Sequence, residues 1–122
     1  MTDTTQALER ALDHVPAIAM VNAERADWGM HTASACVAAG FSIIAVGADT
    51  PSAVHIVGSV SARPDMIVGL ARTRSVQDAK EALESGATFL MSALSNAEVA
   101  QLARDAGIPW IAGALTPNEI EA

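Results

Sequence analysis

Residues 108–120 of the chain read IPWIAGALTPNEI, and this stretch decides the fold. Its apolar run has the length of a β-strand and breaks at Gly113. Thr116 then offers an N-cap hydroxyl, Pro117 suits the first turn of a helix, and Glu119 adds a carboxylate three residues after the hydroxyl. The stretch therefore predicts one complete strand–helix unit.

Four further apolar runs of strand length precede this unit at a regular spacing. The five runs begin near Ala17, Ser42, Met66, Thr88 and Pro109, so their starts lie 25, 24, 22 and 21 residues apart. This period is that of a βα repeat. Because the runs are apolar throughout rather than alternating, they are typical of parallel strands covered on both faces. We therefore expect five parallel strands, each buried on both faces.

The segments between the runs carry helix start and stop signals. Helices are expected over residues 4–15, over 27–39 and over 51–62 with Thr50 as N-cap. Two more are expected from Ser75 to Ser85, opened by Ser75 as the cap with Asp78, and from Ser95 to Ala106, opened by Ser95 as the cap with Glu98. Gly40, Gly86 and Gly107 mark three of the helix ends. Residues 1–122 thus form a single α/β domain in this interpretation.

Composition and charge exclude several functions. Seven Lys and Arg against fourteen Asp and Glu give a net charge of −7, and no basic cluster is available to neutralise the phosphates of a nucleic acid. The apolar runs are too short for a membrane span, and residues 1–6 lack the pattern of a signal peptide, so we expect a cytoplasmic protein. His14, His31 and His55 lack metal-ligand spacing, so neither a metal site nor another cofactor is expected.

Residues 15–120 resemble the N-terminal half of the 2-keto-3-deoxy-6-phosphogluconate and 4-hydroxy-2-oxoglutarate aldolases, which are class I, Schiff-base-forming (β/α)8 barrels. The matching stretches are Pro16 to Val21, Ala39 to Ile44, Met66 to Gly69, Ser85 to Phe89, and Ile108 to Ile120. They represent the first five of the family's eight βα units. The resemblance implies a partial, half TIM barrel. The alternative that we retain is an open, flavodoxin-like sheet of three layers.

The resemblance also implies where catalytic residues should stand. The family's second strand ends in Glu-Val-Thr-Leu-Arg-Thr, whose glutamate handles protons and whose arginine holds substrate. Ala45 and Asp49 occupy these two positions here. The family's Schiff-base lysine lies on its sixth strand, beyond the matched units. Lys80, the only lysine, falls on a predicted helix among acidic residues and is interpreted as a solvated surface residue. No catalytic residue is predicted, which favours a protein that is not an enzyme.

Polar residues do follow the predicted strands, at the end where α/β proteins place their sites. This rim contains Asn22, Glu24, Asp49, Arg72, Thr73, Ser92 and Thr116. An arginine between two carboxylates can bind a small polar ligand, or it can be part of a solvated loop. The rim is therefore the candidate binding site.

Three functions remain open from the sequence. The first is a non-catalytic, aldolase-derived module that works by self-association or by docking on a larger assembly, and Ala45 and Asp49 favour it. The second is a subunit of an aldolase or related lyase whose remaining strands come from another chain. The third is a small-molecule binding domain that uses the rim. Because an incomplete barrel leaves a sheet edge uncovered, we expect a homo-oligomer, and the resemblance implies a trimer.

Overall fold

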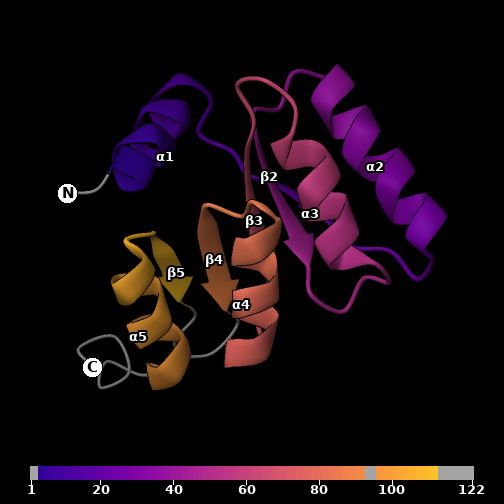
Figure 1. The fold of residues 1–122 in the computed structure, drawn as a ribbon. Coiled ribbons are helices and arrows are strands. Elements are labelled where there is room, and N and C mark those ends of the chain that lie inside the picture. Colours follow the sequence, from indigo (N-terminus) through magenta and orange to yellow (C-terminus); the bar gives the residue numbers. More distant parts are fainter. Residues whose placement is uncertain (1–2, 93–95, 113–122) are drawn as a thin grey trace.

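The computed structural model describes residues 3–92 and 96–112. Five helices alternate with five strands in these residues (Figure 1). In chain order the elements are α1 (Asp3–His14), β1 (Ala19–Val21), α2 (Ala26–Ala38), β2 (Ile43–Gly47), α3 (Ala53–Ser61), β3 (Ile67–Ala71), α4 (Val76–Ser85), β4 (Phe89–Ser92), α5 (Ala97–Ala106) and β5 (Trp110–Ala112). No described helix is long and apolar enough to cross a bilayer.

The five strands form one parallel sheet in which every strand pairs with its neighbour in the chain. This order, β1-β2-β3-β4-β5, is that of five consecutive strands of a (β/α) barrel, with β1 and β5 as the two edges of the sheet. It confirms the predicted partial barrel. The flavodoxin-like alternative is wrong, because in that fold the strand order reverses and the chain covers both faces of the sheet with crossover helices.

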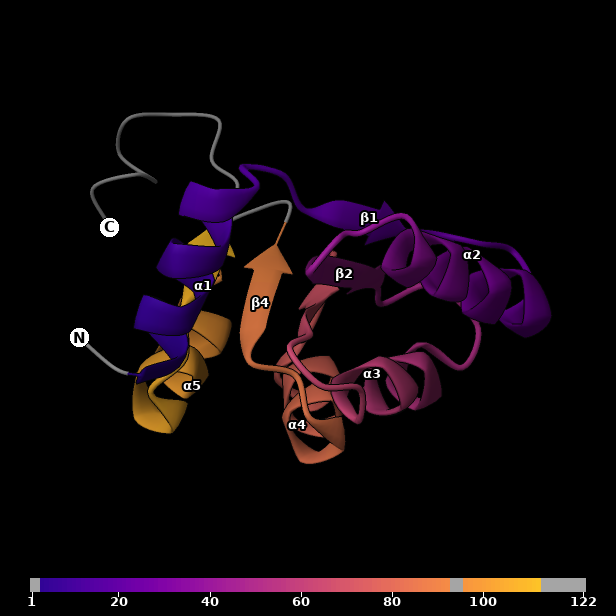
Figure 2. The ribbon, with the colours of Figure 1, turned by 90° about the horizontal axis from the view of Figure 1, so that it is seen from above.

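One face of the sheet is covered by the helices that connect the strands. Ile44 and Val46 of β2, Val68 and Leu70 of β3, and Leu90 of β4 point to this face and pack against α2 to α5. Figure 2 shows the strands along an arc, with α2, α3 and α4 on its outer side. We call the opposite face of the sheet the concave face.

The concave face is covered at one end by α1. Leu8 of α1 packs against Ile43, Ala45 and Phe89, which alternate with the residues of the helix-covered face. Thr4 Oγ1 also donates a hydrogen bond of 2.8 Å to the carbonyl oxygen of Gly107, just before β5. Figure 1 places α1 at the end of the sheet where the strands begin. The carboxyl ends of the strands are left on the opposite side.

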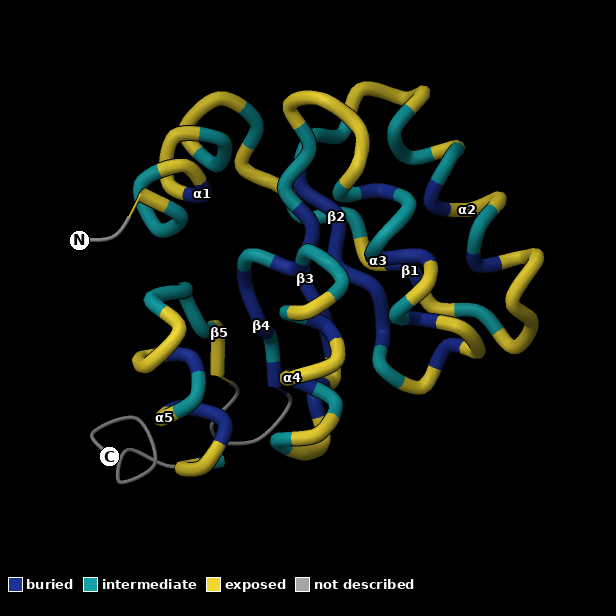
Figure 3. The backbone as a smooth tube through the Cα atoms, in the orientation of Figure 1, coloured by how far each residue is buried: buried dark blue, intermediate teal, exposed yellow. Residues whose placement is uncertain are grey.

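The expectation that every strand is buried on both faces holds for the centre of the sheet and is wrong at its edges. All five residues of β2 are buried, whereas Met20 of β1 is 42% exposed and Ile111 of β5 is 38% exposed (Figure 3). The physical reason is the open barrel. An edge strand has a neighbour on one side only, and its concave side lacks the cover that the opposite wall would give in a closed barrel.

The hydrogen bonds confirm one predicted helix start, at Ser75, and correct another, at Thr50. Ser75 Oγ accepts the backbone N–H of Asp78 at 3.2 Å, which confirms the capping role predicted for it. Thr50 is not the N-cap of α3, because the chain makes a further turn and Ser52 takes that position. Thr50 is buried instead, where its hydroxyl accepts the N–H of Ala23 at 3.4 Å.

The remaining helix signals are confirmed in part. Gly86 and Gly107 end α4 and α5 with φ angles of 115° and 70°, as predicted. The N-cap of α5 is Asn96 rather than the predicted Ser95, since the Asn96 carboxamide accepts two backbone N–H groups, those of Glu98 and Val99. Ser95 itself and the helix start at Thr116 lie outside the described residues.

The contact between β3 and β4 predicts how two glycines respond to the same substitution. Gly69 pairs with Phe89, and a Cβ at Gly69 would lie 2.6 Å from the Phe89 ring and carbonyl oxygen. We expect Gly69→Ala to lower the free energy of unfolding by about 1–3 kcal/mol, because the packed sheet must shift. Urea unfolding followed by circular dichroism measures this loss.

Gly58→Ala is the matched control. Gly58 lies inside α3, and its added Cβ would meet only the Ser85 carbonyl oxygen at an ordinary 3.6 Å. Alanine should therefore raise the free energy of unfolding by about 0.5–1 kcal/mol. Equal midpoints for the two variants would contradict the close β3–β4 contact.

Candidate functional site

The carboxyl ends of β1, β2 and β3 bring three of the predicted rim residues together. Asn22 follows β1 and Asp49 follows β2 by two residues, and both side chains lie over the bare backbone of Gly47. A Cβ at Gly47 would collide with Asn22 Oδ1 and lie 3.0 Å from Asp49 Oδ1. Arg72, directly after β3, approaches Asp49 with 3.8 Å between Nη2 and Oδ2. The result is two oxygen acceptors beside one guanidinium group.

The ion pair in this cluster is open to solvent. The Arg72 and Asp49 side chains are 60% and 48% exposed, so the pair contributes at most about 1 kcal/mol to stability. Arg72 nevertheless has a φ of 55°, in the left-handed region that costs a side-chain-bearing residue about 1–2 kcal/mol. Strained backbone of this kind collects at functional sites. Among the predicted rim residues that the structure describes, Arg72 is the one with a left-handed backbone.

The other predicted rim residues are placed differently. The Thr73 hydroxyl is buried and donates to the Leu70 carbonyl oxygen at 3.2 Å. The Ser92 hydroxyl is also buried and accepts the indole N–H of Trp110 at 2.9 Å. Glu24 lies exposed in the loop between β1 and α2, and Thr116 lies outside the described residues. The structure therefore brings Asn22, Asp49 and Arg72 together and engages Thr73 and Ser92 in bonds within the chain.

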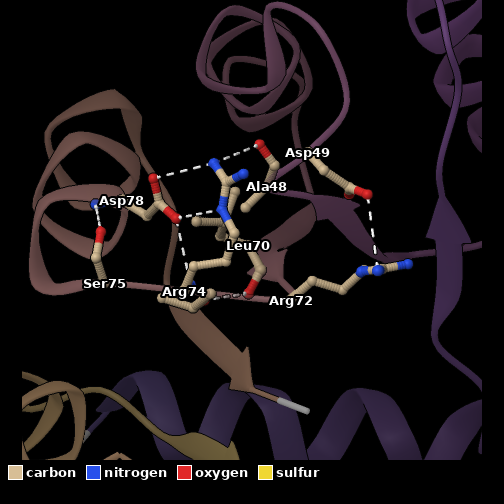
Figure 4. A network of polar contacts seen from close by, with 8 residues as sticks. Ala48, Asp49, Leu70, Arg72, Arg74, Ser75 and Asp78 are labelled. Carbon is tan, nitrogen blue, oxygen red and sulfur yellow. Dashed lines mark hydrogen bonds and ion pairs between the residues drawn. The ribbon is translucent and has the colours of Figure 1, made fainter.

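A second polar network next to this cluster was missed by sequence reasoning. Arg74 donates from Nε to Asp78 Oδ2 at 3.0 Å and from Nη2 to the Ala48 carbonyl oxygen at 3.5 Å (Figure 4). The hydrogen bond and charge of Asp78 raise the pKa of Arg74. In Figure 4 the Arg72 side chain extends toward Asp49, whereas the Arg74 side chain extends toward Asp78 and Ala48. The spacing of four residues between Arg74 and Asp78 was the available signal, although Asp78 was interpreted only as part of a cap.

This network borders a hollow of about 240 Å³ at the ends of β2 and β3. Its lining includes Thr50, Ser52, Leu70, Arg74, Asp78 and Glu81. Since Arg74 is already paired with Asp78 and Glu81 adds a second carboxylate, the hollow does not favour an anionic ligand. Among the residues that the structure describes, no group of three His, Cys, Asp or Glu side chains is placed to hold a metal ion.

The wall of the sheet itself carries no group suited to proton transfer. None of the residues in the five described strands has an acidic or basic side chain. Ala45, where the resemblance places the family's glutamate, is fully buried on the concave face. Lys80 is exposed on α4, in the outer helix layer. General acid–base chemistry at the concave face would therefore depend on residues outside these strands.

Parallel strands in chain order, with the connecting helices outside them, define the class as a partial (β/α) barrel. Residues 8–122 match the family described as KDPG and KHG aldolase, and the chain belongs to that family. This confirms the resemblance inferred from the sequence. Among curated proteins, none matches the chain.

Several solved aldolase structures share the fold. A 4-hydroxy-2-oxoglutarate/2-dehydro-3-deoxyphosphogluconate aldolase from TTHB1 is 25% identical, with a TM-score of 0.77 over 99% of this chain and 58% of its own. The 2-keto-3-deoxy-6-phosphogluconate aldolase of Zymomonas mobilis ZM4, solved with 3-phosphoglycerate, is 19% identical, with a TM-score of 0.78 over 93% of this chain and 55% of its own.

A third structure extends the same comparison. The KDPG aldolase from Legionella pneumophila, solved with pyruvate captured as a covalent carbinolamine, is 21% identical, with a TM-score of 0.73 over 87% of this chain and 52% of its own. The chain thus spans a little more than half the length of these aldolases.

The strain at Arg72 gives a test that separates backbone from side chain. Arg72→Gly and Arg72→Ala both remove the guanidinium group, but only glycine accepts the φ of 55° without cost. We expect the glycine variant to be more stable than the alanine variant by about 1 kcal/mol in urea unfolding. Equal stabilities would show that the chain relaxes this backbone at no cost.

Proposed function

We propose that the chain is a non-catalytic module of the aldolase family that acts by associating with protein chains, first of all with copies of itself. The observation that carries the proposal is a sheet that, within residues 3–92 and 96–112, has no acidic or basic side chain in its strands and has no further strand paired at either edge. The first property argues against Schiff-base chemistry. The second argues for a partner.

The chemical part of the proposal follows from what a Schiff-base aldolase needs. The lysine must be desolvated so that its pKa falls, an acid or base must move protons, and an anchor must hold the substrate anion. Lys80 is exposed on α4, and Ala45 and Asp49 stand where the resemblance places the glutamate and the arginine. Positioning alone can supply about 10 kcal/mol of barrier lowering, so its loss leaves turnover near background.

The association part follows from the edges of the sheet. An open edge presents backbone N–H and C=O groups that pair readily with another strand, and apolar side chains beside it favour burial. Met20 and Ile111 are such side chains, one on each edge strand. The resemblance implies three copies in the assembly. The cytoplasmic setting expected from the sequence stays a prediction.

A second candidate is supported by the length comparison. The structures of the TTHB1 and Zymomonas mobilis aldolases extend well beyond the part that this chain matches, which covers 58% and 55% of them. A partner chain that carries further βα units would pair with the same two edges and could bring a lysine of its own. The rim at Asn22, Asp49 and Arg72 would then face into the completed barrel.

Trapping with pyruvate and borohydride tests the chemical part. We expect intact-mass measurement to show no stoichiometric adduct on Lys80, because this side chain is exposed on α4 and lacks the desolvated pocket that activates a Schiff-base lysine. Peptide mapping separates any reaction of the N-terminal amine, and Lys80→Arg is the matched control. An adduct that maps to Lys80 and disappears in the Lys80→Arg variant would restore the enzyme hypothesis.

Sedimentation velocity tests the association part. We expect a species that is a multiple of the 12.5 kDa chain at micromolar concentration, since burying two apolar edges stabilises the assembly. The mass gives the number of copies, which the resemblance puts at three. A stable monomer over this concentration range contradicts self-association and leaves the second candidate.

A further inference from the structure

Three large hydrophobic side chains are exposed in the described residues, and two of them mark the edges of the sheet. They are Met20 on β1, Ile111 on β5 and Trp28 on α2, which is 53% exposed. Trp28 has a partner within the chain, because the Arg25 guanidinium lies 5.1 Å from the centre of its ring. The exposure of Met20 and Ile111 is therefore the feature that contact with a second chain would account for.

The pairing register places both residues on the concave face. Met20 pairs with Ala45, and Ile111 pairs with Met91. Ala45 and Met91 both belong to the cluster that packs beneath α1. Because directly paired residues of neighbouring strands point to the same face, Met20 and Ile111 lie at opposite ends of one continuous surface.

Neither edge strand contains a charged residue or a proline, which are residues that keep a free edge from pairing. Residues 15–23 around β1 and residues 106–112 around β5 contain no charged side chain. Pro109 does not weaken the outer edge of β5, because its carbonyl oxygen points to β4, where it accepts the N–H of Leu90 at 3.1 Å. Natural proteins protect exposed edges with charges, prolines or bulges, so an uncharged edge indicates a covered one.

We propose that β5 of one copy pairs in parallel with β1 of a second copy. This inference rests on the self-association proposed above and specifies its surface. Parallel pairing continues the strand direction of the sheet and brings Ile111 beside Met20 of the partner copy on the concave face. Each chain has one edge of each kind, so copies of this chain complement one another.

The pairing of unlike edges is favoured over the pairing of like edges. If β1 met β1 of a second copy around a two-fold axis, the two strands would run antiparallel and would break the parallel order of the sheet at the contact. When β5 meets β1 head to tail, every edge is covered once the ring closes. Two copies give a ring of ten strands, the smallest closed assembly that this contact allows.

Disulfide trapping tests this contact directly. The background is Cys36→Ala, which removes the only native thiol, and Met20→Cys and Ile111→Cys are made separately in it. The two variants are co-expressed with different tags, oxidised, and separated on a non-reducing gel. We expect a covalent dimer in the mixture, up to about half of the chains in a two-copy ring, and none when either variant is expressed alone.

Trp28→Cys combined with Ile111→Cys is the matched control, because Trp28 is more exposed than Met20 but lies on α2, away from the edge strands. Sedimentation of every variant checks that folding and assembly are retained. A cross-link of Met20→Cys with itself, or of Ile111→Cys with itself, would overturn the proposal in favour of like edges. A cross-link of equal yield with Trp28→Cys would overturn it as unspecific collision.

The outcomes also separate this inference from the proposed function. An oligomer that gives no mixed cross-link refutes the β5–β1 contact while self-association stands. A monomer refutes both, and the two edges are then left for a different chain with the remaining strands of the family fold.

Discussion

The structure depends on one property of a βα repeat, namely that its connecting helices cover only one face of the sheet when the strands follow one another in order. The side chains of β2, β3 and β4 alternate between the two faces, and both sets are apolar. Helices α2 to α5 bury one set. The other set needs a cover of a different origin, which a closed barrel obtains from its own opposite wall.

In this chain the cover of the concave face is incomplete. Leu8 of α1 shields the beginnings of β2 and β4, where Ile43 and Phe89 are fully buried. Towards the carboxyl ends the residues of this face become small, at Gly47 and Ala71, and the polar group of Asn22 and Asp49 lies over Gly47. The edges receive no cover within the described residues, which is why Met20 and Ile111 are exposed.

Sequence patterns were sufficient for the order of elements and for the family, because period, apolar runs and terminal glycines all agreed with one another. They were less informative where local and tertiary signals compete. Thr50 has the side chain of an N-cap but is drawn into a bond with Ala23, a residue 27 positions away. The exposure of β1 and β5 also could not be predicted from the sequence, since an apolar run has the same pattern in an edge strand and in a central strand.

The candidate site could likewise be predicted only in part from the sequence. Asp49 and Arg72 could be placed at one edge of the sheet because parallel strands end together, whereas the inward or outward direction of a side chain changes with a shift of one residue. Ser92 ends β4 as predicted, yet its hydroxyl bonds to Trp110. The left-handed backbone of Arg72 has no signal in the sequence, because arginine is not a residue that this conformation selects.

The position of α1 has a consequence for the order in which the chain acquires its structure. This helix is synthesised before the strands that it packs against, and Thr4 bonds to Gly107, 103 residues later in the sequence. Its other contacts, at Ile43 and Phe89, also belong to strands that are made after it. Contacts of such long sequence separation form slowly, because closing a large loop costs conformational entropy before the contact can contribute any stabilisation. Helix α1 is thus among the last elements to dock, and until then its apolar side, with Leu8, is open to contact with other chains.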